Sequence, residues 1–199
     1  NNIILLMESK LLNEISNFEE KYYQDNSKNT FFKKSQKMDL AKQVSNNFDI
    51  NILLQNLCYM KKSTNQVVID YNILKLFAND ENFKTIIIHI LKVFTDTINI
   101  FGNFEVHMNL NTFTISAAER YKKLVELFCK LCLNNKETYD YAKVCNKFHI
   151  YNVSNTFEQI VNLFKPFVSP DIKEKVSVLK KSESSDNLWN SLIEGNNIK

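Results

Sequence analysis

The stretch Phe148–Val176 reads FHIYNVSNTFEQIVNLFKPFVSPDIKEKV and contains both prolines of the 199-residue chain, Pro166 and Pro170. The aromatic and β-branched run at its start predicts a strand. Apolar residues then recur at helical spacing from Phe157 to Phe164, which predicts a helix with one apolar face. Each proline disfavours helical geometry at the residue before it. The chain must therefore turn after this helix and continue into a second helix or strand.

Two further strands are predicted upstream of this stretch, at residues 66–71 (QVVIDY) and 104–110 (FEVHMNL). A strongly apolar helix is predicted between them, from residue 83 to residue 98, with Gly102 as its stop. Another helix is predicted at 117–133, and a last short strand at 176–179. Strands that alternate with helices indicate βαβ units. The predicted fold class is therefore α/β, with a mainly parallel sheet covered by helices.

The N-terminal part of the chain has a different pattern. Its apolar residues follow helical spacing at 4–23, more weakly at 31–44 and again after Asp49, with a polar loop predicted at 25–30. No strand pattern occurs in residues 1–62. We therefore expect three parts: a helical lobe at 1–62, the α/β domain at 63–181 and a polar C-terminal tail at 182–199. The tail carries an isolated apolar turn formed by Leu188, Trp189, Leu192 and Ile193.

The composition of the chain argues against several classes of function. The net charge is +3, from 25 basic and 22 acidic side chains, which is too balanced to imply nucleic-acid binding. With two glycines in the whole chain, phosphate-cradling loops are disfavoured. No stretch reaches the roughly 18 consecutive apolar residues of a membrane span. The N-terminus lacks the basic region and the cleavage site of a signal peptide. Four cysteines in apolar contexts indicate reduced thiols in a cytosolic protein.

One pattern is similar to a metal site. Cys129, Cys132, Cys145 and His149 have spacing that superficially matches a three-cysteine, one-histidine zinc site. Cys129 and Cys132 lie within an unbroken helical pattern, so packing of the thiols in the core is favoured over a zinc site or a redox pair. No serine or cysteine lies on a glycine-flanked turn that would make a nucleophile elbow. We therefore predict no catalytic residue, no metal and no cofactor; an enzyme would need a convergent site around His149 or Cys145.

The apolar helix in the opening stretch has two interpretations. Its dense apolar patch is formed by Phe157, Ile160, Val161, Phe164, Phe167 and Val168. It is either an ordinary core helix or a lid over an apolar cavity, hinged where the prolines interrupt it. Burial of one methylene group contributes about 0.8 kcal/mol, so an enclosed acyl chain would gain on the order of 10 kcal/mol.

The same stretch resembles the C-terminal part of CRAL-TRIO lipid-binding domains. The resemblance rests on an aromatic-x-Ile-x-Asn strand followed by Leu-Phe-Lys-Pro-Phe at 163–167, Ser-Pro at 169–170 and Lys-Val at 175–176. FEVHMNLNTFTISAAER at 104–120 is similar to the central strand of that family and the Ser-rich start of the helix after it. The resemblance covers roughly residues 66–179, and the helical N-terminus is consistent with the helical lobe of the family.

This resemblance implies an α/β sandwich with a lipid-sized pocket and a mobile gate at about 154–170. Members of the family bind phosphoinositides, phosphatidylcholine, tocopherol or retinoids, and some are regulatory modules. The implied ligand-binding residues are Phe104, Val106, Met108, Leu110, Phe157, Ile160, Val161, Phe164, Phe167 and Lys175.

The residues that hold lipid headgroups in the family transfer only in part. Lys175 matches the lysine that contacts the inositol phosphate. Lys143 stands in the place of its acidic partner, and Phe104 and Val106 stand in the places of a serine and a threonine that hold the choline phosphate. The resemblance therefore implies hydrophobic-ligand binding without an intact phosphatidylinositol/phosphatidylcholine exchange signature.

The function expected from the sequence is lipid transfer or presentation by a cytoplasmic, peripherally membrane-associated protein. Its partners would be a hydrophobic small molecule and, transiently, an anionic membrane surface. Lys173, Lys175, Lys180 and Lys181 would attract that surface, at about 1 kcal/mol for each lysine near it. The alternative is a non-transferring interaction or regulatory module of the same fold, in which the pocket has collapsed.

Overall fold

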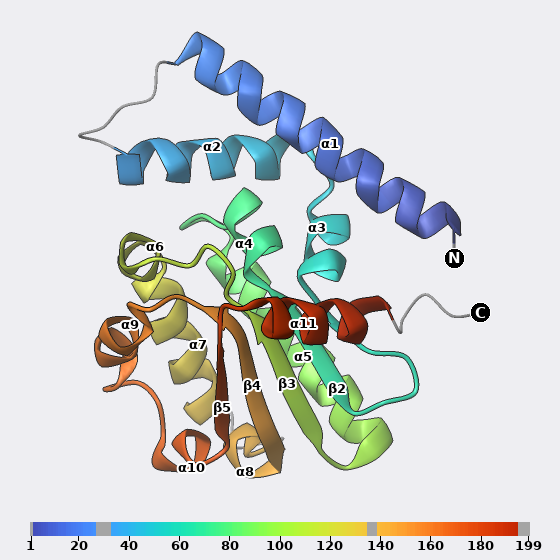
Figure 1. Cartoon of the computed structure of the whole chain (residues 1–199), viewed down its shortest axis with the longest axis vertical. Coiled ribbons are helices and arrows are strands. Elements are labelled where there is room, and N and C mark those ends of the chain that lie inside the picture. Colours follow the sequence, from blue (N-terminus) through green and yellow to red (C-terminus); the bar gives the residue numbers. More distant parts are fainter. Residues whose placement is uncertain (1, 27–32, 135–138, 195–199) are drawn as a thin grey trace.

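A single mixed sheet organises the structure (Figure 1). The computed structural model describes residues 2–26, 33–134 and 139–194. Within them the strands follow the order β1-β2-β3-β4-β5, with β2 to β5 parallel and β1 antiparallel to β2. The predicted α/β class with a mainly parallel sheet is confirmed. The strands are β1 (Cys58–Met60), β2 (Gln66–Asp70), β3 (Phe104–Asn109), β4 (Cys145–Val153) and β5 (Val176–Lys180).

The register of the sheet separates an apolar face from a more polar one. Val67, Val106, Phe148 and Val176 lie side by side in one row across four strands. The next row along the strands contains His107 and His149 and points to the opposite face, because successive side chains of a strand alternate. The two faces of one sheet can therefore carry different chemistry.

Helices cover the apolar face, and one helix crosses the other face. Figure 1 shows α5 and α7 behind the sheet and α11 in front of it. The large core cluster joins side chains of β2 and β3 to α5 and includes Ile160 of α9. The helices after β2 are α4 (Tyr71–Phe77), α5 (Phe83–Phe101), α6 (Ile115–Arg120), α7 (Lys122–Asn134), α8 (Tyr141–Val144), α9 (Phe157–Phe164), α10 (Pro170–Lys173) and α11 (Glu183–Glu194).

Local signals in the sequence set several of these boundaries. Gly102 ends α5 with a left-handed backbone (φ 76°), a conformation that glycine adopts without strain. Asp70 accepts a hydrogen bond from the Asn72 amide at the start of α4. Asp140 caps α8 in the same way. The predicted stop at Gly102 is confirmed.

The N-terminal region contains α1 (Asn2–Asp25), α2 (Lys33–Asn47) and α3 (Ile50–Leu57), as its helical pattern predicts. The hydroxyl of Tyr22 donates to Asp39 at 2.9 Å and ties α1 to α2. The expectation that the first 62 residues contain no strand is wrong, because β1 adds to the edge of the sheet beside β2. The run ILLQNLCYM has helical apolar spacing, and only its pairing with β2 makes its last three residues a strand.

Two other stretches differ from expectation. The single helix predicted at 117–133 is divided at Tyr121 into α6 and α7. The stretch expected as a polar tail instead forms α11, whose Trp189 and Leu192 are buried against Val68 and Tyr151. These two apolar residues are three positions apart, so one helix face presents both to the sheet. In the described part of the chain, no helix is both long enough and apolar enough to cross a membrane.

Candidate ligand-binding site

The centre of the apolar sheet face is packed as core. Phe104 and Val106 on β3 are each 1% exposed. The ring of Phe104 stacks on Phe94 of α5, with centroids 4.5 Å apart and 28° between the ring planes. Stacking and burial of this kind fix both side chains in place. Two of the residues predicted to line the pocket therefore lie against α5.

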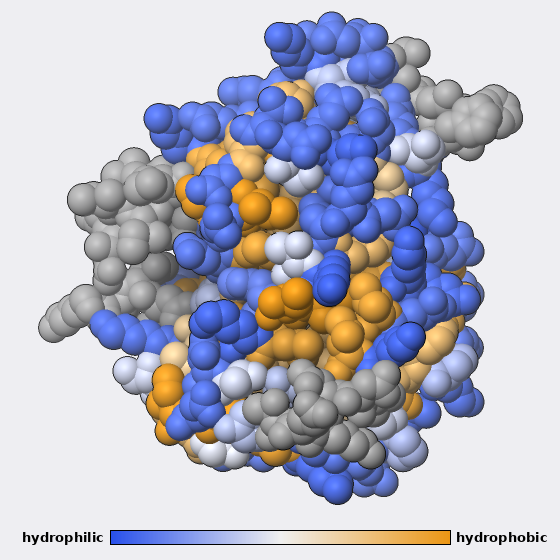
Figure 2. Space-filling model, turned by 180° about the vertical axis from the view of Figure 1, so that it is seen from behind, coloured by the Kyte–Doolittle hydropathy of each residue, from blue (hydrophilic) through white to orange (hydrophobic). Residues whose placement is uncertain are grey.

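Coverage of the same face decreases toward β5, the edge strand. Phe148 and Ile150 on β4 are half-buried, as is Met108 on β3. Val178 on β5 pairs with Ile150 and is 43% exposed. Figure 2 views the helix-covered side and shows apolar side chains gathered in the middle of it, with hydrophilic ones around them. The exposure of Val178 and the half-burial of Phe148 and Ile150 show that the apolar face of β4 and β5 is incompletely covered.

Helix α9 is the element expected to close this site. Ile160 is its one fully buried side chain, at 2% exposed, whereas the adjacent Val161 is 44% exposed. Phe157 and Phe164 are half-buried and pack on the edge of the core. The helix contacts α6 and α7, and Thr156 at its N-terminus makes no side-chain cap. A short helix with one buried anchor is held weakly compared with α5.

The loop after α9 contains the predicted turn. The amide of Phe167 donates to the carbonyl of Phe164 at 2.9 Å, so the chain reverses directly after the helix. Ser169 then caps α10, and Pro170 is the first residue of that helix, where its missing N–H costs nothing. Phe167 is half-buried, and Leu110 at the end of β3 packs on the core.

Lys175, the residue expected to contact a headgroup, is engaged at the end of α8. Its Nζ donates to the carbonyl oxygens of Ala142 at 2.8 Å and Lys143 at 3.1 Å. It therefore occupies the C-terminal end of α8, where a cation is favoured by the unpaired carbonyls. The ammonium of Lys143 lies 3.5 Å from the Asp140 carboxylate. In this arrangement Lys175 ties β5 to α8.

Removal of this cap is expected to lower the stability of the fold. We expect Lys175→Met to lower the free energy of unfolding by about 1–2 kcal/mol, because two carbonyl groups lose a charged donor. Lys173→Met, at an exposed position on α10, is the matched control and is expected to change it by less than about 0.5 kcal/mol. Urea unfolding monitored by circular dichroism compares the two variants, and equal values would show that the cap contributes nothing.

The cysteines have the character of packed thiols. Burial raises the pKa of Cys132 to about 12 and that of Cys145 to about 11. Cys129 and Cys132 lie on α7, whereas Cys145 pairs with Phe104 and His149 points to the opposite face of the sheet. The four residues whose spacing superficially matches a zinc site are therefore not brought together.

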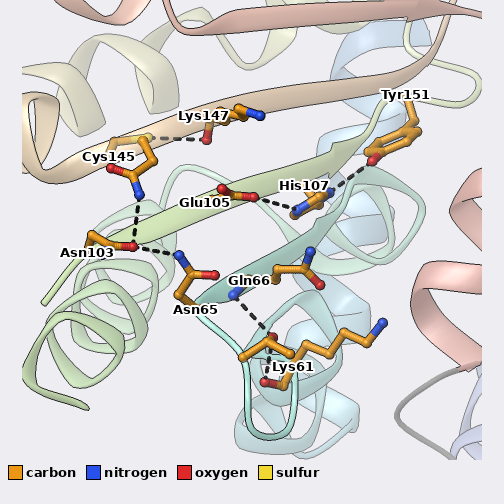
Figure 3. Close-up of polar contacts among 11 residues, drawn as sticks. Lys61, Asn65, Gln66, Asn103, Glu105, His107, Cys145, Lys147 and Tyr151 are labelled. Carbon is orange, nitrogen blue, oxygen red and sulfur yellow. Dashed lines mark hydrogen bonds and ion pairs between the residues drawn. The ribbon is translucent and has the colours of Figure 1, made fainter. Parts of the chain in front are cut away.

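A different cluster, which sequence reasoning missed, lies on the polar face of the sheet (Figure 3). His107 is 5% exposed, and its Nδ1 lies 2.9 Å from the Tyr151 hydroxyl. Its Nε2 lies 3.9 Å from a carboxylate oxygen of Glu105. Burial, with the nearby charges of His149 and Lys61, lowers the pKa of His107 to about 4. The sequence contains one signal of this cluster, since Glu105 and His107 are two residues apart on a predicted strand.

Comparison with known proteins identifies the domain. Residues 102–196 match the family model of the CRAL/TRIO domain. A search of curated proteins finds no match. Among solved structures, the fold is similar to the crystal structure of Sfh5, with a TM-score of 0.53 and 14% sequence identity over 86% of this chain and 67% of that one. At this identity the structural likeness shows the fold alone. The resemblance predicted from the sequence is thus confirmed over residues 102–196, which match the CRAL/TRIO domain model.

Proposed function

We propose that the chain binds a lipid or another small hydrophobic molecule between α9 and the apolar face of β4 and β5. The observation that carries this proposal is the incompletely covered apolar surface at the β5 edge of the sheet. Val178 is 43% exposed, and Phe148 and Ile150 are half-buried within a domain of a lipid-binding family. Apolar surface contributes about 25 cal/mol for each Å² removed from water, so a hydrophobic ligand gains by covering it.

In this proposal α9 is the gate. Its anchor is Ile160, and Pro166 follows it, where the helix cannot continue. When α9 swings away from α6 and α7, Phe157 and Phe164 become exposed together with the ligand. A membrane surface covers that apolar area and so favours the open state, which is the condition needed for ligand exchange.

The ligand is recognised mainly through its apolar part. Phe104 and Val106 are buried and carry no hydroxyl group for a phosphate. Lys175 is engaged by the carbonyls of α8. A phosphoinositide or phosphatidylcholine headgroup would therefore find neither site formed here, and a less polar ligand fits the arrangement better.

The test is to identify what the purified chain carries. We expect native mass spectrometry of the chain from a eukaryotic expression host to show one hydrophobic ligand per chain, and organic extraction to release it. We also expect transfer of that ligand between vesicles to be faster with protein than without. A chain that is consistently empty and does not accelerate transfer would contradict the proposal.

A second candidate function is a non-transferring interaction module. The observation that favours it is the stacking of Phe104 on Phe94, because this part of the expected pocket is filled by the protein itself. Phe104→Ala separates the two functions. If ligand reaches β3, the enlarged space changes the size of the co-purified ligand; if the pocket is closed, the variant loses stability and carries no ligand.

The proposal also includes a cytoplasmic location with transient, peripheral contact with anionic membranes. We expect replacement of Lys173, Lys180 and Lys181 by glutamine to weaken binding to anionic vesicles on the order of 100-fold at low salt, at about 1 kcal/mol for each lysine. The control replaces three exposed lysines elsewhere, Lys84, Lys92 and Lys122, and is expected to bind as the natural sequence does. Vesicle co-sedimentation measures both, and equal loss in both variants would show that only net charge matters.

A further inference from the structure

Three metal-ligating side chains meet on the polar face of the sheet, opposite to the apolar site. Glu105 and His107 are two residues apart on β3, so their side chains point to the same face. His149 pairs directly with His107 across the parallel β3–β4 ladder, and their rings stack with centroids 4.8 Å apart. One possible ligand atom from each of the three residues lies within 4.8 Å of the other two. No other part of the described chain brings such a group together.

A buried nitrogen at this cluster has no partner. The Nε2 atom of His107 is buried and makes no hydrogen bond, although the residue is only 5% exposed. An unpaired buried polar atom costs about 1–3 kcal/mol. The same atom lies on the Glu105 side of the ring, 3.9 Å from the carboxylate. A cation bound between these residues would give Nε2 the partner that the protein itself does not provide.

We propose that Glu105, His107 and His149 bind a divalent first-row transition metal ion, with zinc as the best match. Two imidazoles and one carboxylate form a borderline N/O donor set that suits Zn²⁺ rather than Mg²⁺ or Ca²⁺. The histidines stand on neighbouring strands, so one ion joins β3 to β4. This site is separate from the ligand-binding surface and is independent of the function proposed above.

The geometry requires two adjustments, because the rings of His107 and His149 lie 25° from parallel and do not direct both lone pairs at one ion. The ring of half-buried His149 turns out of its stack on His107, and the Glu105 side chain moves closer. Metal–donor distances of about 2.1 Å in a tetrahedral site place the donor atoms about 3.4 Å apart. The 3.9 Å between Glu105 and His107 shortens to this value by a small rotation of the Glu105 side chain, which is 24% exposed and has room to move. Half-buried His149 and Glu105 give the ion its path from solvent.

Tyr151 favours the tautomer of His107 in which Nε2 is free to bind the ion. Its hydroxyl lies 2.9 Å from Nδ1, so a proton on Nδ1 can be donated to the phenol oxygen, which leaves the lone pair on Nε2 for the ion. Tyr151 is itself fixed by its contact with Trp189 of α11, with ring centroids 5.6 Å apart. Partners of this kind orient ligand histidines in metal sites. Three protein ligands leave a fourth position for water, as in zinc sites that are not structural.

The experiment titrates the full chain with Zn²⁺ after treatment with a chelator, using calorimetry. We expect one ion per chain and an increase in the melting temperature, because an ion that binds the folded state stabilises it. Glu105→Gln and His149→Gln are expected to weaken binding at least about 100-fold. Tyr151→Phe is a test of positioning and is expected to weaken binding about 10-fold. Glu105→Gln is the key variant, because a half-buried isosteric change leaves the fold intact.

Controls separate this site from the thiols. His89→Gln removes a histidine on α5 whose Nε2 lies 2.9 Å from the Cys58 carbonyl, outside the cluster, and is expected to leave Zn²⁺ affinity unchanged. Co²⁺ is expected to give a d–d spectrum without a sulfur-to-metal charge-transfer band. Absence of binding, unchanged affinity in Glu105→Gln and His149→Gln, or a sulfur band that disappears in Cys129→Ser would overturn the proposal.

Discussion

Ile86→Ala is expected to lower the free energy of unfolding by about 2–5 kcal/mol. Ile86 lies on α5 and is fully buried in the main core, in the layer between that helix and the sheet. Truncation removes three methyl or methylene groups from this layer. The remaining cavity adds to the lost transfer free energy, because neighbouring side chains relax only in part.

The matched control is Ile88→Ala, two residues further along the same helix. Ile88 is 54% exposed. The same chemical change there is expected to alter the free energy of unfolding by less than about 0.5 kcal/mol. Alanine raises the helix propensity by the same amount in both variants. The difference between their free energies of unfolding therefore reports burial alone. Urea unfolding measures both, and similar losses in the two variants would contradict the packing of α5 described here.

The elements that sequence reasoning predicted correctly are those whose signal is local. The run QVVID forms β2 because β-branched residues favour strands, although Tyr71, which the prediction included, begins α4. Gly102 ends α5 because it accepts a left-handed backbone. The helix Phe157–Phe164 and the turn after it follow from apolar spacing and two prolines. In each case the residues that decide the structure lie within the element itself.

The elements that sequence reasoning missed depend on partners far along the chain. β1 exists because Tyr59 pairs with Val68, and its own residues continue a helical pattern. α11 is fixed by burial of Trp189 and Leu192 against the polar sheet face. The sequence shows the apolar turn that contains these residues, but it does not show which face of the sheet buries them.

The same limit applies to the candidate sites. The alternation on β3 predicts that Glu105 and His107 share a face, but the contact with His149 requires the β3–β4 register. That register includes an irregularity between Phe104 and Glu105, which no sequence pattern predicts. Likewise, the hydrogen bonds of Lys175 to the carbonyls of Ala142 and Lys143 require α8 to lie near this lysine, which no local sequence pattern predicts.

Ile160→Asp is expected to release α9 from the core and to reduce retained hydrophobic ligand at least about 10-fold. Ile160 is 2% exposed, so its replacement places a carboxylate among the apolar side chains of the core. Burial of an unpaired charge costs several kcal/mol. Because α9 is short and has no other fully buried residue, opening of the helix is the least costly response.

Val161→Asp is the matched control, since it adds the same charge one residue away. Val161 is 44% exposed, so the carboxylate remains in water and ligand retention is expected to stay near that of the natural sequence. Native mass spectrometry measures the retained ligand. Hydrogen exchange of residues 157–164 measures the opening of α9 and does not depend on any ligand.

The two readouts together decide between the candidate functions. Fast exchange in α9 with loss of ligand, and slow exchange in the rest of the chain, is the result expected for a gate. Fast exchange in α9 with ligand retained would show that another element closes the site. Fast exchange throughout the chain would show that Ile160 supports the whole core, as in an interaction module with a closed pocket. The milder Ile160→Ala then resolves the case, because a gate anchor loses ligand before it loses global stability.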